Sequence, residues 1–239
     1  MHTLDLTLPT SQENLACDEA LLDLCEDGFG HETLRFWEPQ KHFAVLGYSN
    51  KIRREINEVS CRRLKIPVLR RASGGGTVLQ GPGCLNFTLI LKVERHAALK
   101  SITRTNVFIM KRHQEALEPL VGRPVAVQGH TDLTVDNLKF SGNAQRRKRK
   151  CVLFHGTFLL NFDIALIEEI LLHPPKEPDY RKNRPHAKFL TNVDLSPETV
   201  KEALKKIWGT DGTLKQIPAE KIEKLVSEKY SKDEWNLKF

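Results

Sequence analysis

Residues 69–91 read LRRASGGGTVLQGPGCLNFTLIL, and this stretch decides how the chain is organised. An apolar strand ends here in two arginines; three glycines, a short apolar run and a second strand, Asn86–Leu91, follow. Glycine lets a backbone N–H approach a ligand without a Cβ in the way. An anionic or acyl ligand along Gly74–Val78 would therefore meet amide donors, with the Arg71 guanidinium at its side. Three glycines are also compatible with a flexible turn, but a hairpin turn needs only one or two.

The composition predicts a reduced protein with one main domain. The chain has 239 residues, 40% of them hydrophobic, which is enough for a core. The N-terminus lacks the basic and apolar segments of a signal peptide, and no apolar run reaches the roughly 20 residues that span a bilayer. We therefore expect a cytoplasmic protein without a membrane partner. The five cysteines (Cys17, Cys25, Cys61, Cys84 and Cys151) include no Cys-x-x-Cys pair, which favours reduced thiols and argues against a zinc site.

The net charge of +7 indicates an acidic partner. Much of this charge lies in one run, Arg146–Lys150, which we interpret as a solvated basic loop. Nucleic acid is an alternative partner for such a run. No aromatic residues alternate with the basic ones and no nucleic-acid-binding motif is present, so we do not expect nucleic acid to be the partner.

Residues 132–141 predict a β-hairpin that presents a single lysine. Asp136-Asn137 is a typical two-residue turn. This turn would pair Val135 with Leu138, Thr134 with Lys139, Leu133 with Phe140, and Asp132 with Ser141. Period-two alternation then places Lys139 among small polar side chains on one face of the hairpin. The alternative is a surface lysine that pairs with Asp132.

The remaining segments predict an α+β fold, with a mixed, largely antiparallel sheet flanked by helices. A strand over Cys151–Asn161 contains His155, which either faces a pocket or is a satisfied sheet histidine. His113 lies on a long helix, Thr103–Leu117, and we expect it to be packed rather than catalytic. We assign residues 1–195 to the catalytic domain and 196–239 to a helical appendage docked on it, because about 45 residues are too few for a separate core.

These parts combine into a cradle of amides with one arginine, an apolar wall and one lysine. The sequence shows no Ser-His-Asp set at recognisable spacing, no metal-ligand cluster and no pair of carboxylates. A cationic lysine and backbone amides suit an activated acyl phosphate, because they would stabilise charge on its oxygens while an amine attacks.

Three segments, RRASGGGTVLQGPGCLNF, GHTDLTVDNLKFSGNAQ and FHGTFLLN, resemble the signature of the lipoate–protein ligase and octanoyltransferase family (the biotin/lipoate A/B protein ligases). The resemblance runs from near Asn14 to near Asn192 and implies the ligase fold of that family. It also implies that Lys139 holds the acyl-adenylate and that the glycine segment wraps the adenylate and the acyl chain. The binding residues implied are Arg71, Ser73, Gly75, Gly76, Thr77, Val78 and Leu79, together with Asp132 and His155.

The reaction implied by this resemblance has two steps. Lipoate (or octanoate) and ATP with Mg²⁺ give an acyl-adenylate, and the acyl group then passes to a lysine of an acidic lipoyl carrier domain. That carrier is an E2 subunit or the glycine-cleavage H protein. The chain lacks the C-terminal accessory domain of the long ligases, so a separate accessory subunit is one expectation. Gln80 and Thr131 replace a histidine and an asparagine of many ligases, and the basic run would lie near the site.

The alternative within this family is a transferase with a cysteine nucleophile, which takes an octanoyl or lipoyl group from an acyl carrier protein or a lipoylated carrier. One group of such enzymes has its cysteine upstream of the lysine, but residues 128–133 contain none. Cys84 and Cys151 remain as candidates, and the basic run would lower the pKa of the Cys151 thiol if that thiol were exposed. We therefore favour the ligase.

Overall fold

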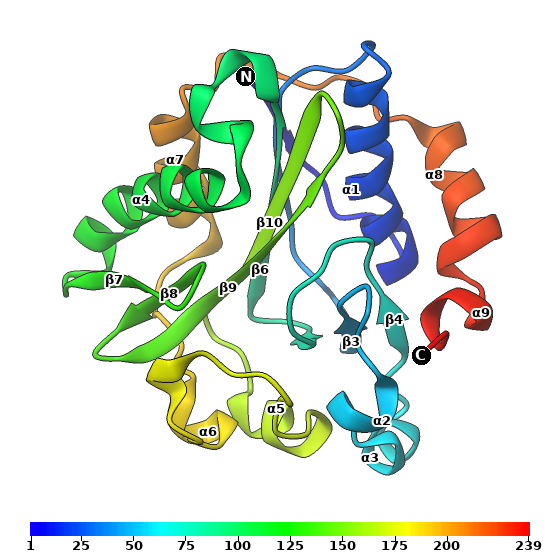
Figure 1. Cartoon of the computed structure of the whole chain (residues 1–239), viewed down its shortest axis with the longest axis vertical. Coiled ribbons are helices and arrows are strands. Elements are labelled where there is room, and N and C mark those ends of the chain that lie inside the picture. Colours follow the sequence, from blue (N-terminus) through cyan, green and yellow to red (C-terminus); the bar gives the residue numbers. More distant parts are fainter.

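The computed structural model describes residues 1–239 and confirms the predicted α+β fold, with a large, mostly antiparallel sheet flanked by helices (Figure 1). The large sheet consists of β1 (His2–Asp5), β2 (Thr33–Trp37), β6 (Cys84–Lys92), β7 (Val125–Gln128), β8 (Asp132–Val135), β9 (Leu138–Arg147), β10 (Cys151–Leu159) and β11 (Gly212–Thr213). Its strand order is β11-β1-β2-β6-β10-β9-β8-β7, with β1 parallel to both of its neighbours. A small sheet, in the order β4-β3-β5, is built from β3 (Phe43–Leu46), β4 (Val68–Arg70) and β5 (Val78–Gln80).

Helices cover both faces of the large sheet. They are α1 (Ser11–Glu26), α2 (Ile52–Glu55), α3 (Glu58–Leu64), α4 (Ile102–Val121), α5 (Ile164–Ile170), α6 (His186–Phe189), α7 (Pro197–Trp208), α8 (Ala219–Leu225) and α9 (Asp233–Asn236). In Figure 1, α4 and α7 lie to one side of the sheet, and α1 and α8 lie to the other. No helix combines the length and the apolar composition needed to cross a bilayer.

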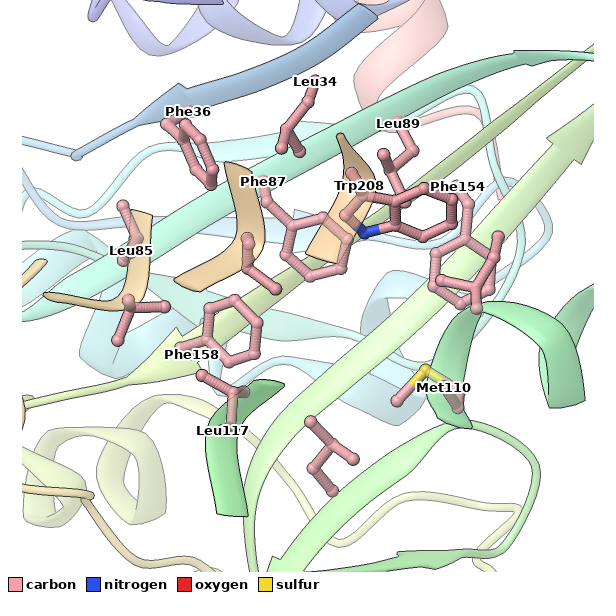
Figure 2. Packing of buried hydrophobic residues seen from close by; sticks show 14 of the residues in the cluster. Leu34, Phe36, Leu85, Phe87, Leu89, Met110, Leu117, Phe154, Phe158 and Trp208 are labelled. Atoms are coloured by element: carbon pink, nitrogen blue, oxygen red, sulfur yellow. The ribbon is translucent and has the colours of Figure 1, made fainter. Parts of the chain in front are cut away.

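The face of the large sheet that α4 and α7 cover is aromatic and aliphatic. Figure 2 shows Phe87 of β6 and Phe154 and Phe158 of β10 packed with Met110 of α4 and Trp208 of α7. The rings of Phe87 and Phe158 stack with their centroids 5.2 Å apart. Burying one such side chain stabilises the fold by about 1.5–3 kcal/mol, so this face supplies much of the folding free energy.

The opposite face of the sheet carries rows of polar side chains, which strand alternation places there. Register aligns Arg35 of β2 with Thr88 of β6, Thr88 with His155 of β10, and His155 with Ala144 of β9. α1 and the small sheet pack over this face. The next row consists of Trp37, Asn86, Thr157 and Gly142. The sheet therefore separates one hydrophobic core from a mixed layer, in which these polar rows lie beside a second apolar cluster that includes Ile90 and Leu153.

The prediction that His113 is a packed helix residue is confirmed. Its side chain is fully buried, and the Trp208 Nε1–H donates to His113 Nε2 at 3.0 Å. Burial lowers the pKa of His113 to about 3, so the imidazole is neutral. Its position between α4 and α7 is on the far side of the sheet from the polar rows.

The predicted hairpin forms, but half of its predicted pairing is wrong. Asp136 and Asn137 both have positive φ, as a tight hairpin turn requires, and Val135–Leu138 and Thr134–Lys139 pair as expected. A bulge between Leu133 and Thr134 then shifts the register, so that Leu133 pairs with Ser141 rather than with Phe140. The predicted pairing of Asp132 with Ser141 fails for the same reason. Such a bulge twists the strand and redirects side chains, which strict alternation does not anticipate.

The interpretation of the basic run as a solvated loop is correct only for its end: Arg146 and Arg147 belong to β9, whereas Arg149 and Lys150 are exposed in the connection to β10. β9 continues through Arg147, and only a tight connection precedes β10. Arg146 donates to the Ala72 carbonyl at 2.7 Å, and the Lys148 ammonium lies 2.5 Å from Asp23 of α1. The Glu26 carboxylate of α1 accepts from the Lys150 amide at 2.9 Å. Acidic residues of α1, more than a hundred positions earlier, thus pair with the side chains of Arg146 and Lys148.

The C-terminal segment packs on both faces of the molecule. α7 adds apolar side chains to the core beneath α4, whereas α8 and the π-helical turn Val226–Tyr230 lie against α1. The Tyr230 hydroxyl donates to Glu19 at 2.7 Å, and Asn236 of α9 accepts from the Arg70 amide at 3.0 Å. The division of the chain at residue 195 stays a prediction.

Candidate functional site

The glycine loop, residues 71–77, joins β4 to β5 and folds around its own arginine. Arg71 donates from its terminal nitrogen to the carbonyls of Gly74 (2.6 Å) and Gly76 (2.7 Å), and from Nε to Ser73 Oγ (3.0 Å). Burial lowers the pKa of Arg71 to about 10, while the nearby Glu55 opposes this shift, so the guanidinium stays charged at neutral pH. In this structure Arg71 shapes the loop from within; its contact with a bound anion stays a prediction.

The backbone of the glycine loop is open toward a ligand. The amides of Gly74, Gly75 and Gly76 donate no hydrogen bond within the chain. Nothing lies within 4 Å of the positions that a Cβ of Gly74 or Gly76 would occupy, and Gly75 has a φ of +87°. A Cβ on Gly47 would lie 2.1 Å from the Gly75 carbonyl, so that close approach requires glycine. The loop thus presents unpaired N–H groups on a fixed support.

The Lys139 amine is held in place rather than free in solvent. Its Nζ lies 2.8 Å from Asp132 Oδ1, and its side chain is 25% exposed. The Tyr180 hydroxyl donates to the other Asp132 oxygen at 2.8 Å, and burial together with this carboxylate raises the pKa of Tyr180 above its ordinary value. A Cβ on Gly142 would lie 2.8 Å from Nζ, so the amine lies directly over the β9 backbone at Gly142.

The fold brings Lys139 and the glycine loop to one face of β9. A Cβ on Gly75 would lie 3.3 Å from the Ala144 methyl group, so the loop rests on Ala144. Ala144 and Gly142 are two residues apart on the same face, which corresponds to about 7 Å along a strand. The two parts of the site, 68 positions apart in the sequence between residues 71 and 139, are therefore neighbours.

A series of three side chains that the sequence did not reveal adjoins the glycine loop. His155 Nε2 lies 2.6 Å from Ser73 Oγ, and His155 Nδ1 lies 3.6 Å from Asp18 Oδ2. The other Asp18 oxygen accepts from the fully buried Arg35 at 2.5 Å. Burial opposes ionisation of Asp18, but Arg35 and His155 outweigh it, and the pKa of the carboxyl lies below its ordinary value.

The sequence shows no Ser-His-Asp set at recognisable spacing, and this arrangement arises only from the fold. Its members come from the glycine loop, from β10 and from α1, and no spacing rule connects them. The sequence pattern that could have indicated this set is on α1, where two polar residues, Asn14 and Asp18, lie one helical turn apart among apolar residues. Both bind Arg35, whose partners were not identifiable from sequence.

The other predicted site residues divide between the site and the core. Val78 packs toward α1, and Gln80, next but one on β5, donates to Thr157 Oγ1 at 2.6 Å on the polar face. Leu79 points to the opposite face of the small sheet, into the core cluster with α3 and α5, so its side chain is not part of the site. The Thr77 hydroxyl accepts from the side-chain amide of Asn50 at 3.1 Å, and the Thr131 hydroxyl donates to the Asn143 backbone carbonyl at 3.0 Å.

None of the five cysteines is available as a surface thiolate. All are buried and free. Cys151 Sγ lies 2.9 Å from Cys25 Sγ, and burial raises the pKa of Cys151, so the basic run does not activate it. Burial likewise raises the pKa of Cys84 to about 12. Both cysteines named as candidate nucleophiles are therefore inert in this structure.

Comparison with known proteins agrees with this geometry. Residues 10–208 match the sequence model of the family described as the lipoyl protein ligase A/B catalytic domain. Octanoyltransferase LipM of Geobacillus kaustophilus is 27% identical over 260 residues, covering 94% of this chain and 93% of that protein. Other relatives are lipoate–protein ligases, or probable ones, by name.

Solved structures share the fold. One is the archaeal bipartite lipoate protein ligase of Thermoplasma acidophilum, described with its E2 lipoyl domain; it has a TM-score of 0.82 and 22% identity, covering 99% of this chain and 95% of that one. Another, a lipoate-protein ligase A bound with ATP, has a TM-score of 0.81 and 23% identity over 99% of both chains. By this family match the chain, with its glycine loop and its partly buried lysine, belongs to the lipoyl protein ligase A/B family, whose enzymes include lipoate ligases and octanoyltransferases.

Proposed function

We propose that this protein is a lipoate–protein ligase, which activates lipoate or octanoate with ATP and transfers the acyl group to a lysine of a lipoyl carrier domain. The observation that carries the proposal is the Lys139 amine, which lies over Gly142 on the face of β9 that supports the glycine loop. An ammonium group and unpaired amides on one face suit the phosphate and carbonyl oxygens of an acyl-adenylate. Lys139 is the catalytic residue of this proposal.

The glycine loop fits the phosphates of ATP, and apolar side chains beside it would contact an aliphatic acid. The open space at Gly74 and Gly76 would let phosphate oxygens reach the amides. Leu15 and Leu153 line a cavity of only about 10 Å³ beside Ser73, which would have to open before a hydrocarbon chain could enter; each CH₂ buried there would gain about 0.8 kcal/mol. The ATP-bound structural neighbour supports ATP as a substrate.

Mg²⁺ would enter this site with ATP. No group of three His, Cys, Asp or Glu side chains in residues 1–239 is arranged to hold a metal ion. Mg²⁺ needs no such group, because it keeps several waters and binds through substrate phosphates and one or two carboxylates.

The acceptor we propose is an acidic lipoyl carrier domain. The net charge of +7 favours an acidic partner, and the E2 lipoyl domain described with the archaeal neighbour supports a domain of this kind. The glycine-cleavage H protein is the second acceptor to test. A separate accessory subunit is part of the same proposal.

One assay tests the first step: exchange of labelled pyrophosphate into ATP by the purified chain. We expect exchange that requires lipoate or octanoate, followed by a mass increase of an added E2 lipoyl domain by one acyl group. Repeating it with the H protein and with a candidate accessory subunit identifies the acceptor and any helper. Absence of acid-dependent exchange under all of these conditions contradicts the proposal.

Lys139→Ala tests the residue on which the proposal depends. We expect acyl transfer to fall at least about 100-fold, because one preorganised charged donor typically contributes that much. Lys100→Ala is the matched control, since Lys100 is exposed and far from the site in the chain. Circular dichroism should show that both variants are folded. Transfer at the wild-type rate in Lys139→Ala would contradict the assignment of Lys139 as the catalytic residue.

The second candidate is an octanoyltransferase, which the LipM relatives favour because they align with 94% of the chain. It would take the acyl group from an acyl carrier protein without ATP. The discriminating experiment incubates the chain with octanoyl-carrier protein and an E2 lipoyl domain in the absence of ATP. Transfer, together with an acyl-enzyme seen by intact mass, would establish the transferase and replace the ligase proposal.

A further inference from the structure

Asp18, His155 and Ser73 form a series of carboxylate, imidazole and hydroxyl beside the glycine loop. All three line one small cavity, and Asp18 and Ser73 are almost fully buried. The cavity and the Lys139 amine lie on the same face of the sheet: His155 pairs with Ala144 across the β9–β10 ladder, and the amine lies over Gly142, two residues along β9.

The hydrogen bonds define where each proton of this series points. Arg71 Nε donates to Ser73 Oγ, which leaves the Ser73 hydroxyl proton for another acceptor. The Asp18 carboxylate, 3.6 Å from His155 Nδ1, favours the tautomer with its proton on Nδ1. His155 Nε2 then accepts from the Ser73 hydroxyl at 2.6 Å. The Ser73 oxygen keeps one lone pair without a partner.

Transfer of an acyl group to a lysine needs a proton acceptor. A lysine side chain has a pKa near 10.4, and its nitrogen must also shed a proton as the amide forms. Lys139 does not fill this role, because an ammonium group has three donors and no acceptor. Asp132 already accepts from Lys139 and Tyr180. The Ser73–His155 pair is a second acceptor system on this side of the sheet, separate from Asp132.

We propose that Ser73 and His155 relay the proton that the carrier lysine releases during acyl transfer, with Asp18 as the positioning residue for His155. This inference rests on the proposed function. The amine nitrogen bonds to the acyl carbon, and the bond from that carbon to the phosphate oxygen breaks, so AMP leaves with the electron pair. The amine proton passes to Ser73 Oγ while the hydroxyl proton passes to His155 Nε2. The imidazolium faces the Asp18 carboxylate and later returns its proton to solvent.

His155 lies within a cluster of charged groups. Arg35 of β2 faces Asp18 and not His155 directly. Thr88 of β6, next to His155 across the ladder, is uncharged. The groups that line the cavity with His155 are Asp18 and Glu19 of α1, Arg71 of the glycine loop, Arg146 of β9 and Tyr230 of the C-terminal segment.

The test separates the two half-reactions. Synthetic lipoyl-adenylate is supplied with an E2 lipoyl domain to measure transfer in a single turnover, and pyrophosphate exchange measures activation. We expect His155→Gln to lower transfer about 100-fold more than exchange, since general-base catalysis contributes about 10²–10⁴-fold. Ser73→Ala should show the same difference. The acidic limb of the wild-type pH profile of transfer should be lost in His155→Gln.

Asp18→Asn tests the positioning role, and we expect a smaller loss of transfer with the acidic limb moved to another pH. His173→Gln is the matched control, because His173 is 45% exposed and outside the site. Thermal unfolding identifies any variant that fails to fold; His155→Asn then replaces His155→Gln. Equal loss of transfer and exchange, or a wild-type pH profile in His155→Gln, overturns the relay. Absence of exchange in the wild-type chain overturns the proposed function instead.

Discussion

Gly142 is the residue over which the Lys139 amine lies. A Cβ there would come within 2.8 Å of both Cε and Nζ of Lys139 and within 3.9 Å of an Asp132 oxygen. Gly47 has the same effect below the glycine loop, where a Cβ would come within 2.1 Å of the Gly75 carbonyl. Missing side chains thus let an ammonium group and a loop backbone lie close to the sheet.

Gly142→Ala should lower acyl transfer about tenfold or more with little loss of stability. The atom that must move is the far end of a flexible lysine, so the fold adjusts, but the amine leaves its position. The measurement is a double-mutant cycle with Lys139→Ala. If Gly142 acts through the amine, adding Gly142→Ala to Lys139→Ala changes nothing further. Additive losses would show that Gly142 has another role.

At the scale of elements, a single hydrogen bond joins α4 to α7 beneath the sheet. The Trp208 indole donates to His113, and the two rings meet edge to face with centroids 5.9 Å apart. His113 also contacts Phe87 of β6 at a centroid distance of 4.7 Å. A neutral imidazole therefore lies where one strand and two helices meet.

Stability should fall below pH 6.5 because of His113. Its pKa is about 3 in the folded protein and about 6.5 in the unfolded chain, so the unfolded state binds a proton that the folded state excludes. The contribution of neutral His113 to the free energy of unfolding is present above pH 6.5 and is lost as the pH falls toward 3. The loss between pH 7 and pH 5 should be about 2 kcal/mol, at about 1.4 kcal/mol per pH unit below the unfolded pKa.

Urea unfolding at several pH values measures this effect, with His113→Gln as the comparison. The glutamine oxygen can still accept from Trp208, but the group no longer titrates. His173→Gln, which changes an exposed histidine, should keep the wild-type pH dependence. An unchanged slope in His113→Gln would show that other groups cause the loss.

At the scale of the whole molecule, Arg70 ties the end of the chain to the site. Its buried guanidinium donates to the carbonyls of Gly47 (2.9 Å) and Asn50 (2.8 Å) and to that of Trp235 (3.2 Å). The Trp235 indole returns a hydrogen bond to the Arg70 carbonyl at 2.8 Å. Gly47 and Trp235 thus both bind Arg70. Through this contact the C-terminal segment supports the strand ends that carry the glycine loop.

Trp235→Ala should lower the free energy of unfolding by about 2 kcal/mol, because it removes ring packing and a hydrogen bond. Acyl transfer should fall as well, since the anchor beneath the glycine loop loosens. Trp235→Phe keeps a ring but loses the N–H donor, so its loss should be about 1 kcal/mol. Thermal and urea unfolding provide the comparison. Wild-type stability in Trp235→Ala would contradict a supporting role for this segment.

The sequence predicts those parts of the fold and site that depend on local pattern. Strand alternation and the Asp136-Asn137 turn identify Lys139, and the triple glycine identifies the loop. Arg146 was misassigned because its partners, Ala72 and Glu19, are distant in the chain. The predicted strand pairing beyond Thr134 was wrong because no residue type in the sequence indicates the bulge.

Asp18, His155 and Ser73 were not grouped for the same physical reason. Each has an ordinary local role, in a helix, a strand and a loop, and only strand register and helix packing bring them together. His113 was predicted correctly, since its helical spacing with Ile109 and Leu117 already places it on a buried face.

The placement of the candidate site on the face of the large sheet opposite its aromatic core has an evolutionary consequence. Substitutions at Ser73, Lys139 or His155 leave the contacts of Phe87, Phe154 and Phe158 untouched, so a lineage can replace its chemistry without rebuilding its scaffold. Substitutions in the candidate site thus need not change the packing of the aromatic core, on which folding depends. Related proteins can therefore differ in their chemistry while keeping the same architecture.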